Sequence, residues 1–298
     1  MNDPTYLARN THGWSVKDWE KGVDIERMRR YRMERVQKQL RACDLAGIIL
    51  FGGVNVRYAT GTRFAQIFNL HSPFRCAWVL AEGKISMFDW ERLFDEEDKP
   101  DMIGEVHDAI VFTYFPAGDR AGEFADNWAA EMAAMIERDG GGSNRIAIDI
   151  CEPIAMLALM KHGIEIVSGE EVVEHACAIK NPDEITLMIQ SITIAEAGLA
   201  RVRENLRPGI TEIELWAELH HENIRNGGEW VEYHLAGSGG RTNPWGQECS
   251  DRMIWAGEFF AIDTGMIGLW GYGADMSRTF HCKPGKPTDE QKRLYRTA

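Results

Sequence analysis

The sequence lacks the features that mark membrane, secreted and nucleic-acid-binding proteins. No apolar run approaches the roughly 20 residues that a membrane span requires, and the first residues carry no secretory signal pattern. Basic residues are outnumbered, with 33 Lys and Arg against 46 Asp and Glu, so the formal net charge is −13. Nucleic acids and anionic membranes bind basic surfaces, so we expect neither as a partner. We expect a cytoplasmic protein.

Cysteines are few, and their spacing does not indicate a metal or redox site. No C-x-x-C pair occurs, and several cysteines fall within apolar stretches, so we expect reduced, mostly buried thiols. A catalytic thiol is disfavoured because no local activating group accompanies any of them. The six are Cys43, Cys76, Cys151, Cys177, Cys249 and Cys282.

What the chain does contain is the composition of a globular protein, 44% hydrophobic and 27% charged, over 298 residues. That length is enough for two domains. In the first half, short apolar runs alternate with amphipathic segments, which favours an α/β layer domain. We predict strands at residues 47–51, 77–80, 85–88, 109–114, 145–149 and 164–167, and helices at 25–43, 123–138 and 153–162.

The second half begins with two predicted helices. Pro182 followed by two acidic residues is typical of a helix start, and this helix is expected to end near residue 205. Thr211 and Glu214 have capping-box spacing, which predicts a second helix ending near residue 226. A strand-like stretch covers residues 231–236, and a last helix opens at Thr288.

Four histidines lie in this half, and none has the spacing of a metal pair. His220 and His221 are adjacent on the second helix and point about a quarter-turn apart, so we interpret them as structural. His234, in the strand-like stretch, either lines a pocket or packs. His281 has no assigned role.

Two aspartates in residues 258–282 are the candidate site. Asp263 ends the apolar run 259–262, and Asp275 precedes a second run, 276–280, across a glycine-rich connection. Two strands joined by a tight loop would form an antiparallel pair with both carboxylates in one pocket. Neighbouring carboxylates repel unless they share a proton or hold a cation, and a divalent metal is the usual solution. In the alternative interpretation, both aspartates only form the turn.

These residues carry a family resemblance. Ile-Asp-Thr-Gly at 262–265 and Ala-Asp-Met-Ser-Arg-Thr-Phe at 274–280 resemble the first two metal-ligand motifs of the creatinase/aminopeptidase P superfamily, the pita-bread metalloenzymes. The resemblance covers residues 24–298 and is most like the dimethylsulfoniopropionate lyase subgroup. Segments 26–32, 55–60, 71–75, 221–230 and 241–249 carry the likeness to that subgroup.

The resemblance implies a mixed α/β (α+β) fold. Its parts would be an N-terminal arm over residues 1–23, a creatinase-like domain over 24–178 and an incomplete pita-bread catalytic domain over 179–298. It also implies a homodimer with a small-molecule substrate. Asp263 and Asp275 would be ligands to one or two divalent ions, and the sequence does not distinguish Fe, Mn, Zn and Co.

The chain departs from the family pattern at three places. Trp245 stands where the peptidases have a substrate-binding histidine, and its π face suits a sulfonium or quaternary ammonium cation, although it can also be a packing aromatic. Gly265 stands where the lyases have an extra aspartate, and the peptidases commonly have glycine at this position. The chain ends at Ala298 before the remaining His, Glu and Glu ligands, so we expect an inactive fragment whose parent supplies these ligands and the catalytic base.

The sequence therefore predicts a metal-dependent lyase that cleaves dimethylsulfoniopropionate to dimethyl sulfide and acrylate. An Xaa-Pro peptidase that hydrolyses a peptide carbonyl is the main alternative, and a creatinase-like amidinohydrolase is a third. A non-catalytic binding protein that keeps the fold and has lost the metal is a fourth.

Overall fold

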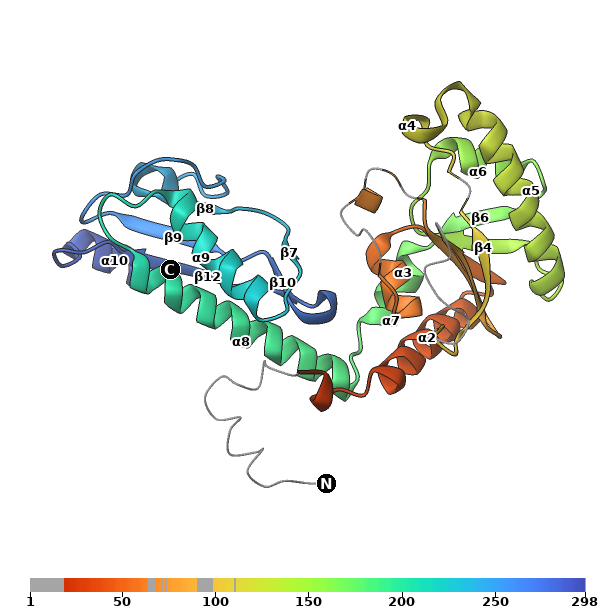
Figure 1. The fold of residues 1–298 in the computed structure, drawn as a ribbon, viewed down its shortest axis with the longest axis horizontal. Coiled ribbons are helices and arrows are strands. Elements are labelled where there is room, and N and C mark those ends of the chain that lie inside the picture. Colours follow the sequence, from red (N-terminus) through yellow and green to blue (C-terminus); the bar gives the residue numbers. More distant parts are fainter. Residues whose placement is uncertain are drawn as a thin grey trace. The chain divides into compact units, whose positions relative to one another are not determined.

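The computed structural model describes residues 19–63, 68–70, 72, 74–89, 99–109 and 111–297, and it divides into two compact units (Figure 1). One unit is Ile25–Asn181, and the other combines Met1–Asp24 with Pro182–Ala298. Most of the arm predicted for residues 1–23 lies outside the described residues. So do His71, Pro73 and Ala298, which belong to segments named above.

A six-stranded mixed sheet forms the centre of the unit Ile25–Asn181. Its strand order is β4-β3-β2-β1-β5-β6. β1 pairs antiparallel with β2 and parallel with β5, so the sheet combines a meander with parallel strands. The strands are β1 (Gly47–Leu50), β2 (Cys76–Leu80), β3 (Ile85–Asp89), β4 (Ile103–Asp108), β5 (Arg145–Ile148) and β6 (Glu165–Ser168).

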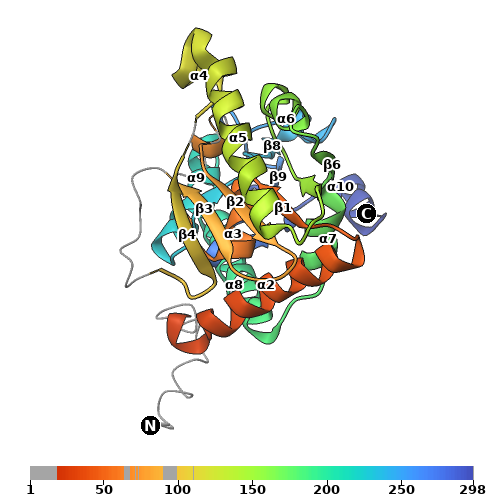
Figure 2. The ribbon, with the colours of Figure 1, turned by 90° about the vertical axis from the view of Figure 1, so that its right-hand side faces the viewer.

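Helices cover both faces of this sheet, as Figures 1 and 2 show. Alternate residues of a strand point to opposite faces, so Ile49 packs on one side of the sheet and Ile48 and Leu50 on the other. The Ile49 side is covered by α5 (Ala121–Asp139) and α6 (Pro153–Met160), and the other side by α2 (Ile25–Ala42), α3 (Gly53–Thr60) and α7 (Glu170–Cys177). The short α4 (Tyr114–Ala117) precedes α5. The predicted α/β layer arrangement is confirmed.

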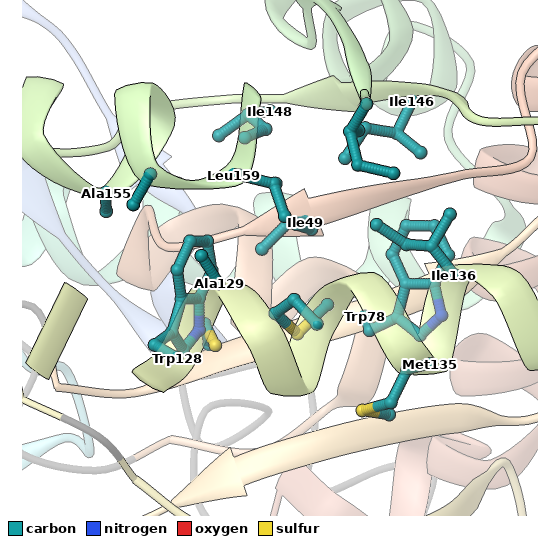
Figure 3. Close-up of a cluster of buried hydrophobic side chains, with 14 of the residues drawn as sticks. Ile49, Trp78, Trp128, Ala129, Met135, Ile136, Ile146, Ile148, Ala155 and Leu159 are labelled. Atoms are coloured by element: carbon teal, nitrogen blue, oxygen red, sulfur yellow. The ribbon is translucent and has the colours of Figure 1, made fainter. Parts of the chain in front are cut away.

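Trp128 of α5 is one of two buried tryptophans in the core on the Ile49 side, with Trp78 of β2 as the other (Figure 3). The Trp128 ring lies 5.7 Å from that of Phe51 and 5.2 Å from that of Phe112, in tilted arrangements that favour aromatic pairs. Ala155 and Leu159 of α6 close the cluster, and both are fully buried.

The strand predicted at residues 109–114 is wrong for the residues that the structure describes there. The strand lies earlier, at Ile103–Asp108, where it pairs with β3. Phe112 is buried in the aromatic cluster instead of pairing with a strand. The apolar character of Phe112 therefore reflects burial of its side chain and not strand pairing.

Two long helices begin the second unit, as predicted. They are α8 (Pro182–Asn205) and α9 (Glu212–Arg225), which lie side by side (Figure 1). The predicted capping box at Thr211 is confirmed, with Glu214 N donating to Thr211 Oγ1 at 3.2 Å. The helices approach closely where Gly198 faces Leu219, because an added Cβ on Gly198 would lie 2.6 Å from Leu219 Cδ1.

The expectation that no segment has the length and hydropathy of a membrane span needs correction. α8 meets both criteria in one 18-residue window. Because 44% of that window is buried and α8 packs against α9, we interpret it as a core helix of its unit.

Two small sheets complete this unit. β9 (Phe259–Asp263) lies between β8 (Ala236–Ser238) and β12 (Ser277–His281), and both neighbours run antiparallel to it. The second sheet has the order β11-β10-β7. Its strands are β7 (Trp230–Val231), β10 (Met266–Ile267) and β11 (Gly273–Ala274), and α10 (Asp289–Thr297) follows β12.

Replacing Trp128 by alanine should lower the free energy of unfolding by about 3–5 kcal/mol, because the change leaves a large cavity in the aromatic core. The matched control is Leu157→Ala. Leu157 lies on α6 and is 62% exposed, so this change should cost less than about 0.5 kcal/mol. Urea unfolding followed by circular dichroism measures both. Equal losses in the two variants would contradict the placement of this core.

Candidate functional site

The two candidate aspartates lie at the same end of an antiparallel strand pair, Asp263 as the last residue of β9 and Asp275 just before β12. β9 and β12 pair in a register that sets Asp263 opposite Ser277, two residues after Asp275. This confirms the predicted antiparallel pair. The predicted tight loop is wrong, because the connection contains β10, a 3-10 turn at Leu269–Gly271 and β11.

One tyrosine hydroxyl joins the two carboxylates. The Tyr233 oxygen lies 3.3 Å from Oδ2 of Asp263 and 3.0 Å from Oδ1 of Asp275. Asp263 Oδ1 also accepts hydrogen bonds from Ser277 Oγ and from its neighbour Thr264 N, both at 3.1 Å. The structure therefore brings together the predicted aspartates and adds Tyr233, which sequence reasoning missed.

A signal for Tyr233 was present in the sequence. It stands in the strand-like stretch 231–236, next to the candidate pocket residue His234. Backbone hydrogen bonds on either side connect this stretch to the hairpin, from Glu232 N to Gly265 O at 2.8 Å and from Asp263 N to Leu235 O at 2.9 Å. The strand-like stretch was therefore visible in the sequence, whereas its pairing with the hairpin about 30 residues later was not.

The electrostatics of the cluster keep the phenol neutral. Burial, followed by the two carboxylates, raises the pKa of Tyr233, so its hydroxyl keeps its proton and donates it. Burial also raises the pKa of Asp263, and the neighbouring Asp275 carboxylate adds to this while the Ser277 hydrogen bond opposes it. Both pKa values, of Tyr233 and of Asp263, rise because partial burial and a neighbouring carboxylate each disfavour the ionised form.

A count of protons shows what this cluster needs. A phenol has one proton, so it can donate to only one carboxylate at a time. With Asp263 and Asp275 both ionised, the second short contact sets a lone pair of Tyr233 against a carboxylate oxygen. A divalent cation with oxygen ligands would supply the missing positive charge, so the donor set fits a hard metal ion. Residues 19–297, without the gaps given above, hold no group of three or more His, Cys, Asp or Glu suited to a metal, so this pair is a partial ligand set.

Side-chain hydrogen bonds fix the hairpin itself. Thr264 Oγ1 donates to Ala274 O at 2.6 Å and accepts from Met276 N at 3.0 Å, so one hydroxyl connects both arms beside the aspartates. The far end is fixed on α8, where Ser191 Oγ accepts from Leu269 N at 3.1 Å.

A buried carboxylate supports the strand beside β9. Glu212 is fully buried, and each of its oxygens accepts from the backbone N and the Oγ of one serine, Ser238 on one side and Ser250 on the other, at 2.7–3.1 Å. Arg241 Nε lies 3.4 Å from it and supplies positive charge. Since Ser238 ends β8, this network positions the strand that pairs with β9.

Trp245 lies in an exposed loop after the 3-10 turn Gly239–Thr242, and it is 47% exposed. It follows a cis peptide bond between Asn243 and Pro244. Trp245 takes no part in the hydrogen bonds that join Tyr233 to the aspartates. The substrate-binding role of Trp245 therefore stays a prediction.

Two of the four histidines pack against one tryptophan. Trp216 stacks on His220 at 5.7 Å between ring centroids, and the edge of His234 approaches the same ring at 4.3 Å. Burial, and then His234, lower the pKa of His220. His221 is exposed, and His281 lies edge-on to Phe259. The hydrogen bonds to the Asp263 and Asp275 carboxylates come from other residues.

All six cysteines are free thiols, as predicted, but only Cys76 and Cys282 are buried and the other four are half-buried. Burial raises the pKa of Cys151 to about 12 and that of Cys249 to about 11, and it raises the pKa of both buried thiols. A thiolate nucleophile is disfavoured at these four positions.

The Glu212 network generates a stability prediction. Glu212→Gln should lower the free energy of unfolding by about 3 kcal/mol or more, because an amide nitrogen then faces hydrogen-bond donors in a buried site. Glu214→Gln is the matched control, since glutamine also completes a capping box, and it should cost less than about 0.5 kcal/mol. Urea unfolding of both variants measures the difference, and equal costs would refute the role of Glu212.

Comparison with known sequences bears on this site. Residues 186–298 match metallopeptidase family M24. The chain is 36% identical over 262 residues to dimethylsulfoniopropionate lyase DddP of Roseovarius nubinhibens, across 86% of this chain and 59% of the relative. The same lyase of Roseobacter denitrificans is 36% identical over 270 residues, across 89% and 60%. The chain thus spans about 60% of the length of these relatives.

Solved structures share the fold at low sequence identity. An Xaa-Pro dipeptidase from Bacillus anthracis superposes with a TM-score of 0.69 at 20% identity, over 89% of this chain and 68% of that one. A prolidase from Pyrococcus horikoshii gives 0.66 at 18% identity, with the same coverage. The predicted pita-bread type of fold is confirmed. Residues 186–298 thus match a metallopeptidase family, and the whole chain is similar in sequence to lyases and in fold to prolidases of the creatinase/aminopeptidase P type.

Proposed function

We propose that the protein containing this chain is a metal-dependent lyase that cleaves dimethylsulfoniopropionate to dimethyl sulfide and acrylate. The observation that carries the proposal is the pair Asp263 and Asp275. Both carboxylates lie within 3.3 Å of one hydroxyl, and a cation would balance their negative charge. Two relatives at 36% identity are named as lyases of this substrate.

Asp263 and Asp275 would hold one or two divalent ions, and Tyr233 and Ser277 would orient their carboxylates. When bound, the ion supplies a Lewis acid that polarises the substrate carboxylate. A base then removes the proton α to that carboxylate, the carbon–carbon double bond of acrylate forms, and the carbon–sulfur electron pair leaves on dimethyl sulfide. We propose that this base and the remaining metal ligands come from the part of the relatives' length that this chain does not span.

Trp245 is proposed to receive the sulfonium group of the substrate. A cation over an indole face is stabilised by about 0.5–2 kcal/mol. The 47% exposure of this residue supports the proposal, because part of the side chain is open to a ligand.

An Xaa-Pro peptidase remains the second candidate, and a specific observation favours it. Gly265 stands where the resemblance to the lyases implies an additional aspartate. Release of dimethyl sulfide from dimethylsulfoniopropionate, compared with hydrolysis of an Xaa-Pro dipeptide by the same preparation of the complete gene product, decides between them. Hydrolysis without lyase activity would contradict the main proposal.

The organisation that the resemblance implies is part of the proposal. Residues 24–178 would form the creatinase-like domain and residues 179–298 the first part of the catalytic domain. The complete protein would be a cytoplasmic homodimer. The net charge of −13 disfavours nucleic acids and anionic membranes as its partners.

Asp263→Asn and Asp275→Asn should each reduce lyase activity of the complete protein on the order of 1,000-fold, because each removes a charged ligand from the metal. Metal content, measured by elemental analysis, should fall in the same variants. Asp251→Asn, an exposed aspartate of the same unit, is the control and should change neither quantity. Full activity in Asp263→Asn would contradict the proposed site.

Trp245→Ala should lower kcat/KM for dimethylsulfoniopropionate about 2- to 30-fold, which corresponds to the loss of one cation–π contact. Trp245→Phe should keep part of the activity. Trp255→Ala removes an even more exposed tryptophan, 60% exposed, and should leave kcat/KM unchanged. If both alanine variants behave alike, Trp245 has no specific role in substrate binding.

A further inference from the structure

The tyrosine that joins the two aspartates also fills the space beside Gly265. A Cβ on Gly265 would lie 2.5 Å from Cε2 and 2.6 Å from Cζ of the Tyr233 ring, closer than real Cβ contacts allow. The backbone hydrogen bond from Glu232 N to Gly265 O, at 2.8 Å, holds the two segments together at this point. A side chain at position 265 and the tyrosine ring therefore exclude one another.

This exclusion bears on the charge of the hairpin. Position 265 lies two residues after Asp263, beside the aspartate pair, and its φ of +42° suits glycine. The cluster described above consequently presents two carboxylates and one neutral phenol. Because the number of charged ligands tunes the affinity of an oxygen site for a divalent cation, whatever occupies this space affects metal binding.

Tyr233 also holds the two aspartates unequally. Asp263 accepts hydrogen bonds from Ser277 Oγ and Thr264 N in addition to Tyr233. Asp275 is exposed, and the Tyr233 hydroxyl at 3.0 Å is the donor that orients its carboxylate in the described part of the chain. Removing the hydroxyl would therefore release mainly Asp275.

We propose that Tyr233 is a positioning residue of the metal site, and that its ring limits the hairpin to two carboxylates by excluding a side chain from position 265. Its hydroxyl orients Asp275 toward Asp263, and the pair Tyr233 and Gly265 together sets the affinity for a divalent cation. This inference rests on the proposed metal role of the two aspartates.

The first test is titration of the metal-free complete protein with Mn²⁺ alone, by calorimetry. Tyr233→Phe keeps the ring and should weaken Mn²⁺ binding about 10- to 100-fold. The matched control is Tyr272→Phe, which removes the hydroxyl that donates to buried Glu184 at 2.6 Å. The control should lower the thermal unfolding midpoint and leave Mn²⁺ affinity unchanged. Equal affinities in the unmodified protein and Tyr233→Phe would overturn the positioning role.

The second test examines the exclusion directly. Gly265→Asp should lower the thermal unfolding midpoint, because the new side chain meets the Tyr233 ring. In the background of Tyr233→Ala, the same Gly265→Asp change should cost much less stability and should tighten Mn²⁺ binding relative to Tyr233→Ala alone. An equal loss of stability in both backgrounds would overturn the exclusion.

These outcomes separate the inference from the proposed function. If the unmodified protein binds no Mn²⁺ and Asp263→Asn changes nothing, both the metal role and the inference fail. If the unmodified protein binds Mn²⁺, Asp263→Asn abolishes binding and Tyr233→Phe does not affect it, the metal role stands and the inference alone is wrong.

Discussion

Repulsion between two carboxylates that share one hydroxyl is the constraint on which the candidate site depends. Tyr233 brings Asp263 and Asp275 within 3.3 Å of a single proton donor, and one proton cannot satisfy both. Burial raises the pKa of Asp263, and repulsion from the Asp275 carboxylate adds to the cost of ionising it. A bound cation would convert that cost into affinity, which is why the geometry favours a metal site over a simple turn.

The surrounding structure holds this unfavourable arrangement in place. Thr264 connects both arms of the hairpin through one hydroxyl, and Ser191 of α8 fixes its far end. The buried Glu212 carboxylate accepts four hydrogen bonds and positions the strand next to β9. Such over-determined surroundings are what allows a functional site to keep groups that repel one another.

Local patterns in the sequence predicted much of this fold, and long-range contacts account for what they missed. Pro182 and the Thr211 capping box mark helix starts through contacts within four residues, so both helices were predictable. The pairing of β9 and β12 followed from two apolar runs, whereas the role of Tyr233 depends on contacts 30 and 42 residues away. Phe112 was misassigned for the same reason, since its side chain packs against Trp128 of α5, a contact that is distant in the sequence.

The most direct measurement is a crystal structure of the complete protein grown with Mn²⁺, with diffraction data collected at the manganese absorption edge. We expect an anomalous peak at about 2.0–2.3 Å from carboxylate oxygens of both Asp263 and Asp275, with the Tyr233 hydroxyl still in contact with Asp275. A fully occupied manganese site elsewhere, with the two carboxylates bound only to Tyr233 and water, would contradict the account.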